Sequence, residues 1–468
     1  MVNDAVLSPP PRGTPGGPKV LLEVFGCQMN KLDAELMATA VRKAGYDFTD
    51  CDEEASAVLL VTCAIRDQAE HRVHSHLGEL ALLKQQNSDL VIGILGCQAQ
   101  REGQDLLDRW PSVDFVLGTR DFHRVGHVLD RVRSDRVRVL ALESVASEVE
   151  YPRDVTLRPH QTRAFVNVMR GCDKRCTYCV VPATRGPEVS RSMEEILSEV
   201  GKLAGEGVKE ITLLGQTVNA WGRHVGRSLG DLLVRLEDVE GLHRVRFITS
   251  HPEEMDDELV DGIASCGKSG LFLHLPPQSG SDAVLRRMAR GYTVSRYGEI
   301  VEQLRERIPG IEIGADIIVG FCGETDDDFA ATYRMVESLK FSQAFIFRYS
   351  PRPGTPAYQH LDDDIPDAVK RERLARVLAL QKRLMLDRHE SMKGKTTEVL
   401  VEGASRRDAD RLFGRNLAFD RVVFQGATAK EGAFVEVEIT GGTELTLYGE
   451  ATGTASSSPR AIRQPVSV

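Results

Sequence analysis

Three cysteines lie within one short loop, in the stretch NVMRGCDKRCTYCVVPATRG. They are Cys172, Cys176 and Cys179, spaced C-x3-C-x2-C, and the aromatic Tyr178 stands just before the third. Three thiolates from one loop can hold three irons of a four-iron cubane and leave the fourth open to a small molecule. A structural zinc site needs four ligands, and no histidine or further cysteine stands nearby. A disulfide is disfavoured because three cysteines cannot all pair. The spacing therefore predicts an iron–sulfur cluster.

A second set of three cysteines is spread over the first hundred residues. Cys27, Cys63 and Cys97 each follow an apolar, strand-like segment, and helical periodicity fills the gaps between these segments. Strand–helix alternation predicts a parallel, doubly wound sheet, which places its ligands at the carboxyl ends of the strands. We expect the three thiols to meet at that edge and hold a second cluster with one open iron. Inert buried thiols are the alternative. The strand-like segments are Val20–Phe25, Ala57–Val61 and Val91–Leu95.

The histidines and the remaining cysteines give weaker evidence for a metal site. His71, His74 and His76 share the helical segment Arg66–Lys84, but only the first two are one turn apart and no carboxylate completes a chelating face, so solvated histidines are favoured. Three further cysteines have no partner at ligand spacing and stay unassigned: Cys51, Cys266 and Cys322.

A second strand–helix series follows a charged connector near residues 131–154. Six units of this kind predict a partial (β/α)6 barrel, and barrels gather their chemistry at the carboxyl ends of the strands. Polar or glycine-rich signatures stand at these stations, although each alone could be a capped loop. Beyond the cysteine loop they contain Gln216, Asn219, Ser250, Gln278, Gly320 and Gly323. The strands are expected at Ala164–Met169, Glu210–Leu214, Val245–Thr249, Leu271–Leu275, Ile311–Ile318 and Gln343–Arg348.

The last third of the chain predicts a long helix and a small β-barrel. The helix spans Asp367–Ser391 and is rich in Lys and Arg, which form either a solvated or a phosphate-facing surface. Short glycine-separated strands over Lys393–Glu450 indicate an all-β module. Its basic residues gather at Arg406, Arg407, Arg411, Arg415 and Arg421.

Composition limits the classes of protein that fit. The chain has 468 residues, 27% of them charged, and a formal net charge of −10, so any nucleic-acid surface must be local. No apolar run reaches the ~18 residues of a membrane span, and the N-terminus does not have the pattern of a signal peptide. Nine cysteines without an export signal predict a reducing cytoplasm.

The motifs together resemble the radical S-adenosylmethionine methylthiotransferases, over residues 19 to 450. C-x3-C-x-aromatic-C is that superfamily's cluster signature. FGCQMN at Phe25–Asn30, TCAIR at Thr62–Arg66, LGQTVNA at Leu214–Ala220 and SPRPGTP at Ser350–Pro356 are similar to the tRNA-modifying branch of MiaB type. The chain departs from the usual pattern at Val61, Pro277 and Cys322, none of which is an expected cluster ligand.

The resemblance implies an α/β architecture of three domains. A disordered leader at 1–18 precedes a flavodoxin-like methylthiotransferase domain at 19–135. A radical SAM partial barrel at 155–391 and an RNA-binding TRAM β-barrel at 392–453 follow, with a disordered tail at 454–468.

The resemblance also implies the activity: a methylthio group added to carbon 2 of isopentenyladenosine at position 37 of tRNA, with two [4Fe-4S] clusters and S-adenosylmethionine. The loop cysteines would bind the S-adenosylmethionine cluster, and Cys27, Cys63 and Cys97 the sulfur-carrying one. Cofactor contacts are expected from Tyr178, Gln216, Asn219, Ser250, Gln278, Gly320 and Gly323.

The expected partner is the tRNA anticodon loop, held by the TRAM-like barrel and the basic helix. A cytoplasmic monomer without membrane contact is favoured, while the reductant protein and the sulfur source stay unknown. Two other classes remain open. One is a sister methylthiotransferase acting on threonylcarbamoyl-adenosine or on a ribosomal-protein aspartate, and the other is a non-catalytic Fe–S and RNA-binding protein.

Overall fold

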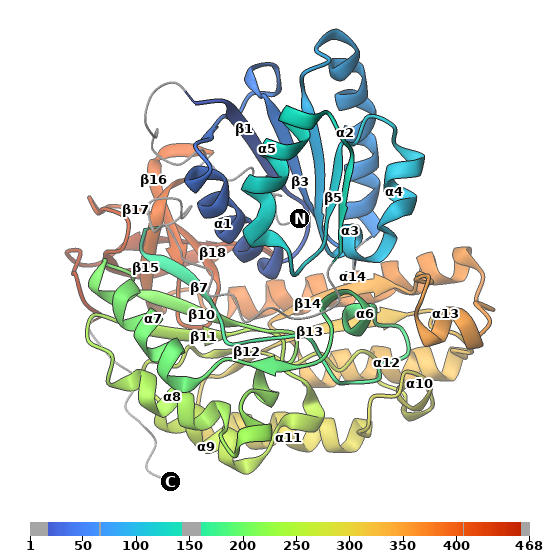
Figure 1. Cartoon of the computed structure of the whole chain (residues 1–468). Coiled ribbons are helices and arrows are strands. Elements are labelled where there is room, and N and C mark those ends of the chain that lie inside the picture. Colours follow the sequence, from blue (N-terminus) through green and yellow to red (C-terminus); the bar gives the residue numbers. More distant parts are fainter. Residues whose placement is uncertain (1–16, 65–66, 143–160, 406, 460–468) are drawn as a thin grey trace. The chain divides into compact units, whose positions relative to one another are not determined.

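The computed structural model describes residues 17–64, 67–142, 161–405 and 407–459 (Figure 1). The expected leader up to residue 16, the segment 143–160 and the tail from residue 460 lie outside the described residues. Contacts divide the chain into two compact units. Unit 1 comprises residues 1–159, 171–173 and 180–188, and unit 2 comprises residues 160–170, 174–179 and 189–468. The expected barrel and the expected TRAM module thus share one unit.

Unit 1 is built on a six-stranded, all-parallel sheet with the order β2-β1-β3-β4-β5-β6. The order reverses between β1 and β3, which makes that pair the topological switch point of a flavodoxin-like sheet. All residues of β3 and β4 are buried, as expected for strands covered on both faces. The strands are β1 (Lys19–Val24), β2 (Asp47–Phe48), β3 (Ala57–Thr62), β4 (Val91–Gly96), β5 (Phe115–Leu117) and β6 (Val139–Ala141).

Helices cover both faces of this sheet, and two separate apolar clusters fill the layers. One cluster joins alternate strand residues to α1 and α5, and the other joins the remaining residues to α2, α3 and α4. The doubly wound domain predicted from the alternation is confirmed. The helices are α1 (Gln28–Lys43), α2 (Asp67–Gln86), α3 (Cys97–Glu102), α4 (Gln104–Arg109) and α5 (Val125–Asp135).

Unit 2 contains the six expected parallel strands, arranged as two sheets of three with the orders β11-β10-β7 and β12-β13-β14. A single bridge between Val245 and Ser269 lies between the two sheets. The partial barrel is confirmed. Its strands are β7 (Arg163–Asn167), β10 (Glu210–Leu214), β11 (Arg244–Phe247), β12 (Phe272–His274), β13 (Glu312–Val319) and β14 (Gln343–Arg348).

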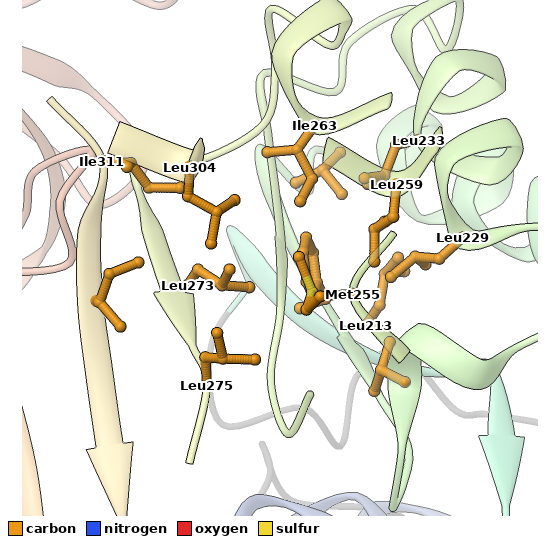
Figure 2. Packing of buried hydrophobic residues seen from close by; sticks show 14 of the residues in the cluster. Leu213, Leu229, Leu233, Met255, Leu259, Ile263, Leu273, Leu275, Leu304 and Ile311 are labelled. Atoms are coloured by element: carbon orange, nitrogen blue, oxygen red, sulfur yellow. The ribbon is translucent and has the colours of Figure 1, made fainter. Parts of the chain in front are cut away.

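Helices pack on one side of these strands. Figure 2 shows leucine and isoleucine side chains from α8, α9 and α11 meeting Leu213 of β10 and Leu273 of β12. Ser192, Ser228 and Thr325 begin their helices with complete capping boxes, which satisfy N–H groups that the helix cannot pair. The helices are α7 (Met193–Gly205), α8 (Leu229–Glu237), α9 (Asp257–Ser265), α10 (Asp282–Arg287), α11 (Val294–Arg307) and α12 (Asp326–Leu339).

The C-terminal module is a closed five-stranded barrel with the order β15-β16-β17-β19-β18, as the short strands predicted. Its interior is a small apolar cluster that includes Val399, Phe424 and Val437. The strands are β15 (Thr396–Ser405), β16 (Asp408–Arg415), β17 (Arg421–Gln425), β18 (Phe434–Gly442) and β19 (Leu447–Ala451).

The basic helix α14 (Asp367–Glu390) uses its cations mainly within the protein. Arg373 is buried and bonds Glu324 at 2.8 Å and Asp326 at 2.7 Å, and Arg388 bonds Glu312 and Asp420. Lys370 is buried and pairs with Asp363. These three cations, the most buried of the helix, are therefore not available to bind tRNA phosphates as expected. No helix in the described part of the chain has the length and apolarity that a bilayer crossing requires.

Candidate functional site

Cys27, Cys63 and Cys97 stand at the carboxyl edge of the unit 1 sheet. Cys27 lies between β1 and α1, Cys63 directly follows β3, and Cys97 is the first residue of α3 after β4. Because β1, β3 and β4 are neighbours in one parallel sheet, their carboxyl ends lie side by side. Cys27 and Cys63 flank the switch point, where sheets of this topology bind ligands.

A buried asparagine in α1 ties two of these strand ends together. The Asn30 side-chain amide donates to the carbonyl oxygens of Phe25 (3.2 Å) and Thr62 (2.8 Å), and the Cys27 thiol donates to Asn30 Oδ1 at 3.4 Å. The backbone of Gly26, whose φ is +135°, also lies close to Cys63. A Cβ on this glycine would be 2.5 Å from Cys63 Cβ. The strand ends are therefore packed too tightly for larger residues.

Arg185, at the end of α6 (Val181–Arg185), reaches the third cysteine of this edge. Its Nε donates to Cys97 Sγ at 3.2 Å, and its Nη2 bonds Asp33 Oδ2 at 2.6 Å. Burial raises the pKa of the Cys97 thiol, and the guanidinium opposes that rise. Sequence reasoning did not single out Arg185 or Asp33, because nothing in their spacing indicates that they pair. The only sequence signal was the position of Arg185 six residues after Cys179.

The loop that carries the other three cysteines begins with a sharp turn. Gly171 has φ +75°, and a Cβ there would lie 1.9 Å from the carbonyl oxygen of Pro187, so only glycine fits. Cys172 belongs to unit 1, where its N–H donates to the carbonyl of Gly186 at 3.1 Å. Cys176 and Cys179 belong to unit 2, and the Cys179 N–H donates to the carbonyl of Cys176.

Within unit 2, a second buried arginine contacts a cysteine. Arg290 Nη1 lies 3.4 Å from Cys176 Sγ, its Nε donates to Tyr292 Oη at 3.0 Å, and its Nη2 donates to the carbonyl of Pro276 at 3.1 Å. The Tyr292 hydroxyl in turn donates to the carbonyl of Pro277 at 2.8 Å. Pro277, one of the departures from the family pattern, is thus part of the scaffold that holds Arg290.

Tyr178 packs against the loop that follows β13. Its ring meets Phe321 edge to face, with the ring centroids 6.4 Å apart. Cys322, another departure, is buried in the same apolar cluster as Phe321 and Tyr349. A thiol there behaves as a small apolar side chain, which explains why the substitution fits. Val61, the third departure, is a buried core residue of β3.

The strand-end residues of unit 2 divide into bonded and unbonded groups. Asn219 accepts from the His251 N–H at 2.8 Å and donates to the His251 carbonyl at 2.9 Å, so its amide holds two loops together. Gln216 Oε1, Ser250 Oγ and His251 Nε2 are buried and have no hydrogen-bond partner among the described residues. Burial, with the nearby charges of Arg290 and Lys174, lowers the pKa of His251 to about 2, which keeps its ring neutral.

The remaining candidates are positioned by their backbones. Gln278 has φ +66°, and its backbone bonds β13 on both sides, through Asp316 and Ile318. Gly320 and Gly323 also have positive φ, but a Cβ on Gly320 would meet the side chain of Lys370. The absence of a side chain at Gly320 therefore makes room for Lys370 of α14.

Of the three histidines of α2, His74 and His76 contact separate partners, and His71 is exposed. His74 stacks on Trp110 with the ring centroids 5.9 Å apart, and His76 Nε2 lies 2.7 Å from Glu23 Oε2. The expectation of a solvated side chain is therefore wrong for His76, whose side chain is only 14% exposed. No group of three His, Cys, Asp or Glu side chains surrounds a single metal position in the described residues. A four-iron cluster places each thiolate on a different iron, so cysteines that hold one need not surround a single point.

Comparisons with known proteins cover nearly the whole chain. Residues 166–336 match the Radical SAM superfamily, residues 19–118 the uncharacterized protein family UPF0004, and residues 390–452 the TRAM domain. The tRNA-2-methylthio-N(6)-dimethylallyladenosine synthase of Protochlamydia amoebophila is 42% identical over 92% of this chain and 96% of its own length. The synthase of the same name from Bacillus subtilis is 41% identical over 97% of this chain and 89% of its own.

Solved structures agree on the fold. The radical S-adenosylmethionine methyltransferase TsrM from Kitasatospora setae, with cobalamin and a [4Fe-4S] cluster bound, gives a TM-score of 0.53 at 16% identity, over 73% of this chain and 74% of that one. The cobalamin-dependent S-adenosylmethionine radical enzyme OxsB gives 0.51 at 14% identity, over 79% of this chain and 56% of that one. At these identities the likeness concerns the fold alone.

Proposed function

This chain belongs to the family of tRNA-2-methylthio-N(6)-dimethylallyladenosine synthases, and we propose that it adds a methylthio group to carbon 2 of isopentenyladenosine at position 37 of tRNA. The observation that carries the proposal is the pair of three-cysteine sets, one at the edge of a flavodoxin-like sheet and one in the loop after β7. Radical SAM membership implies one [4Fe-4S] cluster and S-adenosylmethionine. The second cluster is part of our proposal.

The side chains of both sets suit iron–sulfur clusters. Cys172, Cys176 and Cys179 would hold the cluster that binds S-adenosylmethionine, and Cys27, Cys63 and Cys97 would hold the cluster that carries sulfur. When bound, clusters and S-adenosylmethionine supply the one-electron chemistry that an unactivated aromatic C–H bond requires. The chain supplies thiolates and N–H donors to sulfur from Arg185 and Arg290. Hydrogen bonds of this kind are what a protein uses to tune a cluster.

The unbonded polar atoms in unit 2 suit the polar parts of S-adenosylmethionine. Gln216 and Ser250 follow β10 and β11, and His251 is the next residue. Buried polar atoms are normally bonded, so three without partners at the carboxyl ends of neighbouring strands indicate a ligand that satisfies them. Because the Asn219 amide both donates to and accepts from the His251 backbone, we assign it to holding this edge in place.

An apolar surface on β14 suits the isopentenyl group of the substrate. Phe345 and Phe347 are 44% and 37% exposed, whereas Ile346 between them is buried in the core under the helices. Strand residues alternate between faces, so both rings lie on the face away from the helices. Phe347 is paired in register with Ile318, near the carboxyl ends of both strands, where barrel enzymes place their substrates.

The experiment that tests the function is nucleoside mass spectrometry of bulk tRNA from a deletion strain and from the same strain complemented with this chain. We expect 2-methylthio-isopentenyladenosine to disappear on deletion, isopentenyladenosine to accumulate, and complementation to reverse both. Loss of the methylthio form of threonylcarbamoyl-adenosine would instead indicate the sister activity. An unchanged nucleoside profile would contradict both. Action on tRNA places the protein in the cytoplasm in this proposal.

The β14 surface has its own test. With a purified, reconstituted enzyme and an anticodon stem-loop, Phe347→Ala should raise KM for the isopentenylated substrate more than it lowers kcat, because the ring binds a part of the substrate that does not react. Val234→Ala, on the helix α8, is a control that also removes part of an exposed apolar side chain and should leave this ratio unchanged. An equal effect of both variants would remove β14 from the substrate site.

A further inference from the structure

Arg185 is a buried cation whose two partners are a sulfur and a carboxylate. Its side chain is 7% exposed and that of Asp33 is 6% exposed. Nε donates to Cys97 Sγ at 3.2 Å while Nη2 holds Asp33 Oδ2 at 2.6 Å. Cys97 otherwise packs with the apolar side chains of Ala64 and Val180. Asp33 therefore fixes the guanidinium from one side, and Nε is directed to the thiol.

Stability alone does not account for this arrangement. Taking two charges out of water costs several kcal/mol per ion, and replacing a buried ion pair by apolar side chains is often neutral or stabilising. Cys97 already packs with the apolar side chains of Ala64 and Val180, surroundings that do not themselves require a charge. The pair is better explained by what its charges and its N–H do to the cysteine.

We propose that Arg185, held by Asp33, is a positioning residue that sets the reduction potential of the cluster bound by Cys27, Cys63 and Cys97. This inference rests on the second cluster of the proposed function. It adds that the segment 180–188, which directly follows Cys179 in the chain, supplies the tuning group for the cluster of unit 1.

The charges of Arg185 and Asp33 predict the direction in which each substitution shifts the reduction potential. Reduction adds one negative charge to a cluster, so a cation or an N–H donor near its sulfur favours the reduced form and raises the potential, while a carboxylate lowers it. Arg185 donates to the sulfur, and Asp33 balances its charge. Removing the guanidinium should therefore lower the potential, and neutralising the carboxylate should raise it.

The other cluster offers a matched control. Arg290 contacts Cys176 Sγ at 3.4 Å, and its remaining polar contacts among the described residues are the Tyr292 hydroxyl and the Pro276 carbonyl, with no carboxylate. It is as deeply buried as Arg185, at 5% exposed. A substitution at 290 thus removes a comparable buried arginine from the other cysteine set.

The experiment uses the full-length chain carrying Cys172→Ala, Cys176→Ala and Cys179→Ala, so that only the unit 1 cluster remains. After anaerobic reconstitution, the midpoint potential is followed by EPR during redox titration, with iron and sulfide content measured on each sample. We expect Arg185→Gln to lower the potential, Asp33→Asn to raise it, and Arg290→Gln to leave it unchanged. Asp33→Asn is nearly isosteric and serves if Arg185→Gln does not fold.

A second measurement tests the contact between Arg185 and the cluster without relying on the reduction potential. With 15N-arginine incorporated, pulsed EPR of the reduced cluster should show a weak nitrogen coupling that Arg185→Gln removes and Arg290→Gln keeps. An unchanged potential in Arg185→Gln with full iron content would overturn the proposal, and so would shifts of the same sign in Arg185→Gln and Asp33→Asn. Absence of any cluster from the triple-cysteine background would overturn the second cluster itself, and the iron content identifies that outcome.

Discussion

Arg244, at the start of β11, donates from Nη1 to the backbone carbonyl of Arg415 at the end of β16, 2.9 Å away. The neighbouring Arg246 donates to the carbonyls of Asn416 and Leu417, and its guanidinium stacks over the ring of Phe419 at 4.8 Å. Both arginines are nearly fully buried. The turn between β16 and β17 therefore covers the amino-terminal end of the partial barrel, opposite the edge that carries the candidate site.

Truncation after Met392 should consequently damage the barrel as well as RNA binding. Truncation removes the carbonyls of the β16–β17 turn that accept from Arg244 and Arg246, although Arg246 keeps its bond to Glu210 at 2.9 Å. The barrel loses these hydrogen bonds and the apolar contacts that the module makes with it, which lowers its stability. We expect a lower Tm and reduced iron content, measured by calorimetry and iron assay. Arg407→Ala, an exposed change in the same module, should alter neither. Full iron content and an unchanged Tm after truncation would contradict this coupling.

Iron content should distinguish the two cysteine sets. The reconstituted chain should hold two clusters of about four irons each. Substitution of Cys172, Cys176 and Cys179 by alanine should leave about four irons and abolish S-adenosylmethionine cleavage, because the open iron that binds this cofactor is gone. Cys266→Ala, a buried cysteine bonded to Glu237, is the matched control and should keep both clusters. About four irons in the intact protein would refute the two-cluster proposal.

The elements that could be predicted from sequence are those with a strong local pattern. Glu210–Leu214 and Gln343–Arg348 are strands with the expected bounds, because apolar runs between turn residues specify a buried parallel strand. The three cysteines after β1, β3 and β4 were placed correctly for the same reason. The closed C-terminal barrel followed from short strands separated by glycines.

The contacts that could not be predicted join residues far apart in sequence. Arg185 and Asp33 are 152 positions apart, and Arg246 meets Asn416 from 170 positions away. Periodicity gives the face of a helix but not the carboxylate that will stand opposite a given cation. For that reason Arg373 and Arg388 looked available for phosphates in sequence, and in the structure they form internal ion pairs.

The ion pair between His76 and Glu23 should make stability depend on pH. The hydrogen bond to Glu23 raises the pKa of His76 to about 9, against the opposing effect of burial, with smaller contributions from Glu79 and Asp52. A raised pKa in the folded state gives stability that is fully present below the unfolded value of about 6.5 and is lost as pH rises through about 9. We expect the Tm difference between the native chain and His76→Gln to shrink between pH 6.5 and 9. A constant difference would show that His76 is not protonated in the folded protein.

tRNA affinity should depend on the exposed cations of the C-terminal barrel. Arg407 is exposed, and Arg421 lies over Phe413 at 5.1 Å, an arrangement that suits phosphate and base contacts. Each phosphate contact adds about one unit to the slope of log affinity against log salt. We expect Arg407→Ala and Arg421→Ala each to weaken binding and reduce that slope by about one, measured by filter binding over a salt series. Arg383→Ala on α14 is the control with equal charge loss. If Arg383→Ala weakens binding as much as Arg407→Ala and Arg421→Ala do, the phosphate contacts lie on α14 as well.

The division of labour between the two cysteine sets gives the most discriminating assay. Cys63 lies at the end of β3 in unit 1, packed against Gly26, whereas Cys176 and Cys179 belong to unit 2. If the sets act independently, Cys63→Ala should lose sulfur delivery and keep the reductive cleavage of S-adenosylmethionine. Deoxyadenosine should therefore still form at a rate close to that of the native chain, while methylthio product falls below detection. Both products are quantified from the same reaction by mass spectrometry.

The matched variant for that assay is Cys51→Ala, which removes another cysteine of unit 1, one that bonds Glu53 rather than lying at the sheet edge. It should form both products. If Cys63→Ala forms no deoxyadenosine while its iron content shows that the loop cluster is assembled, independent roles for the two sets are wrong. The same loss with all iron gone would mean that one shared cluster needs ligands from both sets. Because iron content separates these two results, the pair of measurements decides between independent, coupled and shared sites.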